Sequence, residues 1–278
     1  MSTTGRLTVR RALLPFPDVV LAMLFVVGNA AIALSHLNGT MKWGRLTAVT
    51  VVALMVFGRQ RLLCLVEKQR GAARRERREV MPVVFGTAAL EAVIVYPLGL
   101  AAMAAWAATL AFAVLSTKRF FLASWFETRR ELYTLVAATR AVFLGAFVVA
   151  GVSEAPIVEL GAVGMGLSVT NWSLHSLLMF TRGVQGRGEV AQENRSSGRL
   201  SPAGAAAVCA LHIAIANSVL LFAPLPSSAP LFAASAVALM VALFYATEPR
   251  LDRAIIFRVT MNVFLAGFYG ALVTALAP

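Results

Sequence analysis

Basic residues alternate with long apolar segments along this chain, and nearly all of them fall on one side of that alternation. Nine apolar segments divide the 278 residues, and 22 of the 25 lysines and arginines lie at the N-terminus or in every second connection. Cationic loops remain on the cytoplasmic side when helices insert into a bilayer, so this bias reports orientation. The pattern predicts a protein that crosses the membrane repeatedly, with its N-terminus in the cytoplasm.

The apolar segments are long enough to cross the hydrocarbon core, which takes about 20 residues in a helix. Backbone groups in lipid need partners within their own segment, so helices are expected. The predicted fold class is an all-α polytopic membrane protein of about nine transmembrane helices, forming a single domain over 1–278 with the C-terminus outside. The predicted spans are 14–35, 46–66, 80–96, 99–116, 131–151, 157–180, 203–222, 229–246 and 255–276.

The composition excludes several other classes of protein. Apolar residues make up 59% of the chain and charged residues only 14%, whereas a soluble domain carries roughly 25% charged residues. The net charge of +12 comes from short clusters beside apolar segments, which suits anionic lipid better than nucleic acid. Two cysteines and three histidines argue against a disulfide framework, a zinc site or a di-iron site. We expect a multi-pass protein of the cytoplasmic membrane.

Two polar cytoplasmic loops, at about 67–79 and 182–202, carry most of the candidate chemistry. Glu189 and Glu193 in the second loop are four residues apart, so a helix would place both carboxylates on one face. Such a pair can hold a divalent cation that binds phosphate, and the neighbouring Arg195 can bind phosphate oxygens directly. The same pair is also consistent with two solvated loop acids.

The first of these loops begins at Glu67, which sits where an apolar helix meets a dense run of arginines that includes Arg70. This run either locks the orientation of the protein or forms the basic wall of an anion pocket.

Ionisable and polar side chains also occur inside the predicted spans. Arg140 lies near the middle of 131–151, where a charge costs about 2.5–3.5 kcal/mol on insertion scales and needs a partner or a wet cavity. Glu91 is similarly placed, and Asn171 and His175 lie one helical turn apart in the sixth span. These residues can line a substrate cavity, or they can form hydrogen bonds between helices.

The layout of nine helices, with the chief polar loops after the second and sixth, resembles that of the UbiA-like intramembrane prenyltransferases. That family carries an N-D-x-x-D-x-x-x-D motif at the end of helix two and a D-x-x-x-D motif after helix six. Here E-V-A-Q-E-N-R-S-S-G-R-L-S-P has the spacing of the second motif, with Glu189 and Glu193 in its acidic positions. Lys118 and Arg119 follow the fourth span, where the family often has a basic residue for diphosphate.

The first motif departs from the family pattern. When Glu67 is aligned with its last acid, Gln60 and Leu63 stand at the other acidic positions and Arg59 replaces the asparagine. Only one of the three metal-binding acids remains. Arginines such as Arg59 can neutralise a diphosphate without a full metal set; equally, the site can be inactive.

The resemblance implies an enzyme that ionises an isoprenyl diphosphate, for prenyl transfer to a hydrophobic or aromatic acceptor or for terpene cyclisation. The alternatives are a non-catalytic relative that binds an isoprenoid lipid and a small-solute transporter, although the paired inverted repeats of many transporters are not evident. The resemblance and the polar pattern together suggest magnesium at Glu67, Glu189 and Glu193, diphosphate at Arg59, Arg70, Lys118, Arg119 and Arg195, and a cavity lined by Arg140, Asn171 and His175.

The charge bias makes a direct prediction about topology. A reporter fused after Pro278 should lie outside the cytoplasm, because an odd number of spans separates the two termini. Alkaline phosphatase and green fluorescent protein fusions at this position check it. A fluorescent, cytoplasmic C-terminus would remove one span from the proposed topology.

Overall fold

The computed structural model describes residues 16–37, 39–68, 73–115, 130–190, 202–217, 237–238, 240 and 251–276. Every regular element within these ranges is helical, as predicted. The α-helices are α2 (Phe16–His36), α3 (Trp43–Lys68), α4 (Ala73–Val95), α5 (Leu100–Leu115), α7 (Arg130–Ser153), α8 (Gly161–Val190), α9 (Pro202–Ala216) and α12 (Leu251–Leu272), with 3-10 turns η1 (Tyr96–Leu98), η2 (Ile157–Leu160) and η3 (Val273–Leu276).

Eight of the nine predicted spans coincide with these α-helices. Of the remaining one, 229–246, only 237, 238 and 240 are described, and they are helical. The total number of spans and the side of the C-terminus therefore stay predictions.

The two polar loops are shorter than the sequence predicts. Helix α4 already begins at Ala73, so the arginine run that follows is helical, and α8 continues as far as Val190. Arginine and glutamate are good helix formers, and a helix can extend beyond the hydrocarbon core where water meets its polar side chains.

Several helices have the length and apolar character of membrane spans. In the described part of the chain, Val19–His36 and Met81–Leu98 qualify, and Ala138–Ser153 with Ile157–Leu177 qualifies as a pair bent by 87°. Helix α4 leaves Phe85, Leu90 and Val93 more than half exposed. Large apolar surfaces of this kind are unfavourable in water and suit contact with lipid. The protein is a helical membrane protein.

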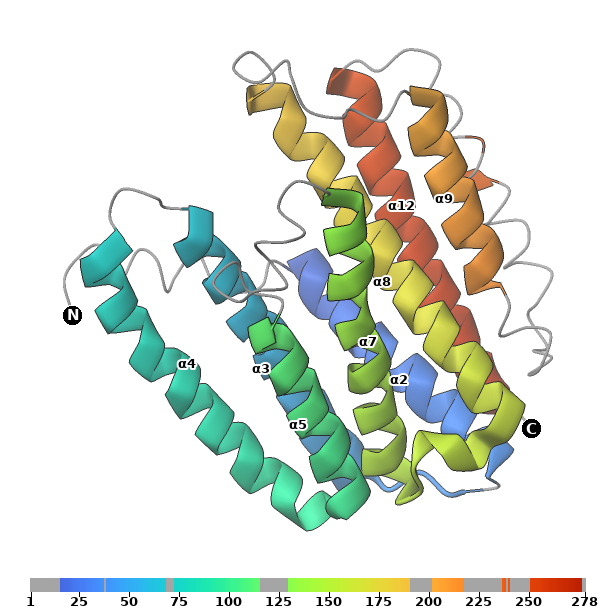
Figure 1. Cartoon of the computed structure of the whole chain (residues 1–278). Coiled ribbons are helices and arrows are strands. Elements are labelled where there is room, and N and C mark those ends of the chain that lie inside the picture. The colour runs from blue at the N-terminus through green and yellow to red at the C-terminus, as the bar shows by residue number, and fades with distance from the viewer. Residues whose placement is uncertain are drawn as a thin grey trace.

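Helix α2 holds the bundle together from its interior. It packs against α3, α7 and α12, and α8 packs against α7, α9 and α12. Val26, Ala30 and Ala33 of α2 are fully buried in the apolar core, where they face residues such as Phe147 and Phe268. Figure 1 shows α4 along one edge of the described helices and α9 near the opposite edge.

A buried amide pair fastens α2 to α8. Asn171 Nδ2 donates to Asn29 Oδ1 at 2.7 Å, and Asn29 Nδ2 donates back to Asn171 Oδ1 at 3.3 Å. Tyr269 of α12 donates its hydroxyl to Asn171 Oδ1 at 3.2 Å. Gly145 of α7 lies directly against this pair, and a Cβ there would collide with the Asn171 amide. Four helices therefore meet at one polar contact.

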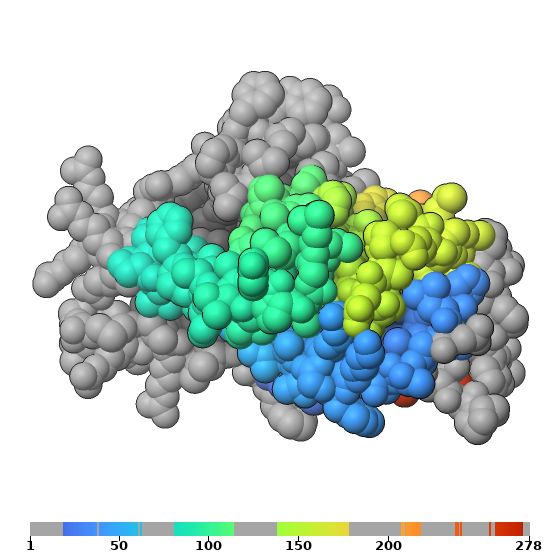
Figure 2. Space-filling view, turned by 90° about the horizontal axis from the view of Figure 1, so that it is seen from below, coloured from blue at the N-terminus to red at the C-terminus, as the bar shows by residue number. Residues whose placement is uncertain are grey.

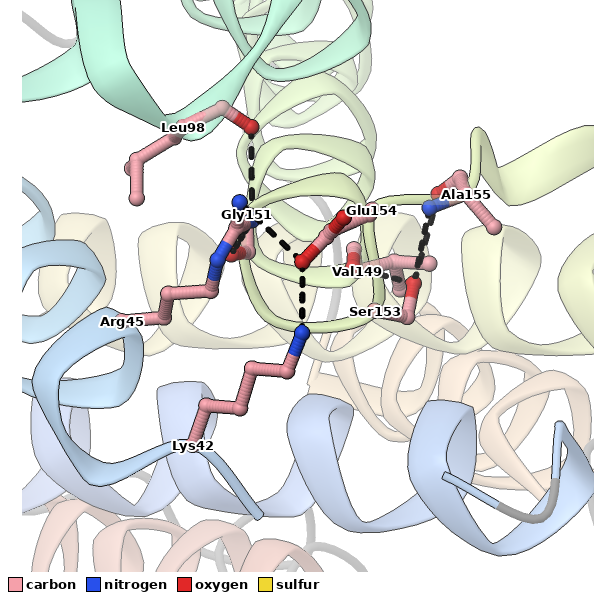
Figure 3. A network of polar contacts seen from close by, with 8 residues as sticks. All are labelled: Lys42, Arg45, Leu98, Val149, Gly151, Ser153, Glu154 and Ala155. Carbon is pink, nitrogen blue, oxygen red and sulfur yellow. Dashed lines mark hydrogen bonds and ion pairs between the residues drawn. The ribbon is translucent and has the colours of Figure 1, made fainter. Parts of the chain in front are cut away.

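Three connections close one end of the bundle. The α2–α3, α4–α5 and α7–α8 connections all lie at the lower end of Figure 1, and Figure 2 views this end directly. Lys42 Nζ and Arg45 Nη2 both contact Glu154 Oε1, at 2.7 and 3.2 Å. Arg45 Nη1 also donates to the carbonyl oxygens of Gly151 and Leu98, at 3.1 and 3.4 Å; Figure 3 shows this network. Lys42 and Arg45 are the two basic residues in the connections that the sequence predicts to lie outside the cytoplasm. In the structure their contacts with Glu154 join the α2–α3 connection and the start of α3 to the α7–α8 connection.

Because the Asn171 amide lies so close to Gly145, any side chain at position 145 is expected to lower the stability of the fold. Gly145→Ala should destabilise the protein by about 1–3 kcal/mol, because overpacking forces neighbouring groups to move. Gly86→Ala is the matched control: Gly86 lies on exposed α4 with nothing within 4 Å of an added Cβ. It should be neutral or slightly stabilising, since alanine favours helix. Thermal unfolding in detergent measures both, and equal midpoints would disprove the packing of Asn171 on Gly145.

The Glu154 contacts predict a pH-dependent stability. The hydrogen bond from Lys42 and the charges of Arg45 and Lys42 lower the pKa of Glu154 below its ordinary value of 4.5. A lowered folded-state pKa stabilises the fold above the unfolded value, and this contribution disappears as the pH falls through the folded value. The stability difference between wild type and Glu154→Gln should therefore be full near neutral pH and shrink below a pH of about 4.5. Thermal unfolding across this range measures it; a difference that does not change with pH would contradict the assignment.

Candidate functional site

A buried ion pair joins α3 to α4 inside the bundle. Arg59 Nη1 lies 2.6 Å from Glu91 Oε1, and the two side chains are 5% and 0% exposed. Removing two charges from water is costly, and only good geometry with further hydrogen bonds offsets that cost. Arg59 was predicted to bind diphosphate, and in this structure Glu91 holds it.

The indole of Trp106 completes this contact from α5. Trp106 Nε1 donates to Glu91 Oε2 at 2.9 Å, so each carboxylate oxygen has a different partner. Arg59 Nη2 is buried and has no hydrogen-bond partner among the described residues. We call Arg59, Glu91 and Trp106 the Arg59 cluster. Its arginine uses one terminal nitrogen for Glu91 and has the other available.

Two of the three predicted cavity residues contact each other. Arg140 Nη2 lies 3.2 Å from His175 Nε2, and Arg140 is only 4% exposed. A guanidinium has donors and no acceptor, so Nε2 of His175 accepts this hydrogen bond and the ring proton sits on Nδ1. The contact gives the mid-span arginine a partner on the neighbouring helix α8.

The third predicted cavity residue, Asn171, is fully buried in its pairing with Asn29 and Tyr269. It forms contacts between helices, which is the alternative role that the sequence left open for polar residues in spans. The assignment of Asn171 to a substrate cavity stays a prediction.

Most of the predicted polar-loop residues cannot be placed. Glu67 and Glu189 lie on α3 and α8, where the structure describes only the backbone. Arg70, Lys118, Arg119, Glu193 and Arg195 fall outside the described residues.

The first-motif position does not fit a magnesium ion. Leu63 offers no donor atom there, and the Arg59 guanidinium repels a cation. Within the described part of the chain, no three His, Cys, Asp or Glu residues come together as metal ligands. Magnesium at Glu67, Glu189 and Glu193 remains a prediction, because the structure describes none of these side chains.

Sequence reasoning missed several residues of these polar contacts. It marked Glu91 as a polar residue in a span without finding its partner Arg59. It did not single out Asn29 or His212, although each interrupts an apolar run. His212 stacks on Trp172 at 5.9 Å between ring centroids, and its Nδ1 lies 2.7 Å from the Val208 carbonyl oxygen. The position of each polar residue deep in an apolar segment was the signal that could have identified it as a partner in a contact between helices.

Comparison with known proteins adds one finding about the fold. The sequence matches no protein-family profile, and no curated protein matches it. Its structure is similar to a solved structure of a digeranylgeranylglyceryl phosphate synthase in membranes, with a TM-score of 0.60 and 12% sequence identity. The similarity covers 99% of this chain and 100% of that chain. From its first helix to its last, this chain has the fold of that membrane-embedded synthase.

Proposed function

We propose that this protein is a UbiA-like membrane enzyme that ionises an isoprenyl diphosphate for prenyl transfer to a lipophilic acceptor or for cyclisation. The single observation that carries the proposal is the similarity to the synthase over the full length of both chains. That neighbour is a UbiA-like prenyltransferase. The spacing of the second acidic motif, which the fold comparison does not use, independently favours the same family.

The reaction breaks the bond between the allylic carbon and the diphosphate oxygen, and the electron pair leaves with the diphosphate. Hydrogen-bond donors fixed near that oxygen stabilise the charge that develops as the bond breaks. Arg59 is a suitable donor because its guanidinium stays charged inside the bundle and one terminal nitrogen is not used by Glu91. Glu91 and Trp106 fix its position.

The cation left behind needs an apolar environment that excludes water. A nucleophilic atom of the acceptor then forms a bond to the allylic carbon and loses its proton. In a cyclisation, a double bond of the same prenyl chain forms the ring and a proton leaves the product. The predicted cavity residues Arg140 and His175 lie on α7 and α8 as a contacting pair, so they would orient a substrate together.

A second candidate function is non-catalytic binding of an isoprenoid lipid. The observation that favours it is the first motif, where Gln60 and Leu63 replace metal-binding acids and Arg59 is engaged by Glu91. The membrane fold and the second motif would be retained in such a protein, and turnover would be absent.

The deciding measurement is pyrophosphate release by the purified protein with geranyl, farnesyl and geranylgeranyl diphosphates. The assay is run with magnesium, and with and without a membrane extract that supplies acceptors. Release is expected, and Glu189→Gln/Glu193→Gln should reduce it at least about 100-fold if these carboxylates hold the diphosphate through a metal.

Arg45→Gln serves as the control, because Arg45 lies in the Glu154 network at the end of the bundle that the α2–α3 and α7–α8 connections close. It should lower stability and leave turnover per folded molecule unchanged. Full activity of the double glutamine variant would disprove the second-motif assignment. Absence of release under all conditions, together with binding of a diphosphate analogue, would establish the non-catalytic lipid binder instead.

A further inference from the structure

We infer that Arg59 takes the place of a metal ion at the first motif, so that this protein binds the diphosphate of its ligand there without a divalent cation. The inference rests on the proposed function and specifies how one of its two polar sites works. Its basis is the geometry of the Arg59 cluster. Nη1 of the guanidinium contacts Glu91, whereas Nη2 has no hydrogen-bond partner among the described residues.

The first step of the argument is the way Glu91 divides its two oxygens. A carboxylate facing an arginine commonly accepts two parallel hydrogen bonds from the guanidinium fork. Here Oε1 accepts from Arg59 at 2.6 Å, and Oε2 accepts from Trp106 Nε1 at 2.9 Å. The indole therefore occupies the oxygen that would otherwise complete the fork. Nη2 of Arg59 is left with no partner among the described residues.

The second step is the cost of that arrangement. A buried donor without a partner loses the hydrogen bonds that it had to water, and the loss is larger for a charged group. The Arg59 side chain is only 5% exposed, so contact with bulk solvent offsets little of that loss. A two-nitrogen fork on Glu91 would engage both terminal nitrogens, whereas here only Nη1 contacts the carboxylate. The unused Nη2 instead suits a second anion.

The third step is the chemistry of the anion. Guanidinium groups bind phosphate oxygens through charge-assisted hydrogen bonds, and they do so without a metal. Arg59 stands in the sequence where the resemblance places a metal-binding motif, next to Gln60 and four residues before Leu63. A guanidinium of the protein itself, held by Glu91, thus offers a charged hydrogen-bond donor at this position.

The nitrogen is closed off from solvent in this structure, so the ligand must displace neighbouring groups to reach it. We therefore expect the diphosphate to bind together with the apolar chain that carries it, since burial of the chain contributes the free energy of opening.

The test is binding of farnesyl thiodiphosphate, a non-ionising analogue, to the full-length protein in detergent, by calorimetry in excess EDTA and again in magnesium. Wild type should bind in EDTA. Arg59→Gln alone would leave Glu91 buried without its cation and can fail to fold. The informative variant is Arg59→Gln/Glu91→Gln, which removes both charges, leaves two amides that can pair, and should weaken binding in EDTA at least about 10-fold.

The matched control is Arg45→Gln/Glu154→Gln, which removes the same kinds of side chain from the network around Glu154. Its affinity for the analogue should equal that of wild type. Binding that requires magnesium, or that is equal in the Arg59→Gln/Glu91→Gln variant and wild type, would overturn the inference. Pyrophosphate release in the same preparation would then still support the proposed function. Failure of both binding and release would reject both proposals.

Trp106 is a positioning residue in this scheme, because it acts through Glu91. Trp106→Phe keeps a six-membered aromatic ring and removes the pyrrole ring with its N–H donor, which frees Glu91 Oε2 to take the second nitrogen of Arg59. The affinity of the folded protein for the analogue in EDTA should fall about 3- to 10-fold. A purely structural indole would change only the thermal midpoint, so an unchanged affinity of the folded fraction would count against the inference.

Discussion

The absence of water from the hydrocarbon core is the constraint on which this bundle depends. A polar side chain there must find its partner within the protein, because lipid offers none. Three of the interhelical contacts in the described interior join two polar side chains: Asn29 with Asn171, Arg59 with Glu91, and Arg140 with His175. Each joins two different helices, so the polar residues decide which apolar faces meet. Arg59 Nη2 is a buried, charged donor that the described residues leave without a hydrogen-bond partner.

The two ends of the bundle use their charges differently. At one end Lys42 and Arg45 contact Glu154, and Arg45 also donates to backbone carbonyls, which ties α3, η1 and α7 together. The sequence predicts that the arginine-rich connections lie at the opposite end and orient the protein in the bilayer. The same connections contain the predicted diphosphate ligands Arg70, Lys118, Arg119 and Arg195.

The comparison with the synthase separates fold from chemistry. At 12% identity the two chains share an architecture over their whole length, and a fold can host more than one function. The function must therefore be argued from the site. At the first motif this chain has Arg59 at the asparagine position of the family pattern, and Gln60 and Leu63 at two of its acidic positions. Glu91 holds Arg59, and Trp106 donates to the other oxygen of Glu91. We propose that this guanidinium binds the anion that metal-held acids bind in the family.

The sequence by itself determined the helical class and the approximate position of most described helices, because the length of an apolar segment is a local property. Helix ends were less predictable. Helix α4 already begins at Ala73 and α8 extends to Val190, so both helices include residues that were predicted to lie in polar loops. The pairing of Asn29 with Asn171, 142 residues away, was beyond sequence reasoning. So was the meeting of Arg59, Glu91 and Trp106. A helix that is apolar on all sides has no face marked for burial, so only tertiary packing sets its rotation and neighbours, and with them the partner of each buried polar side chain.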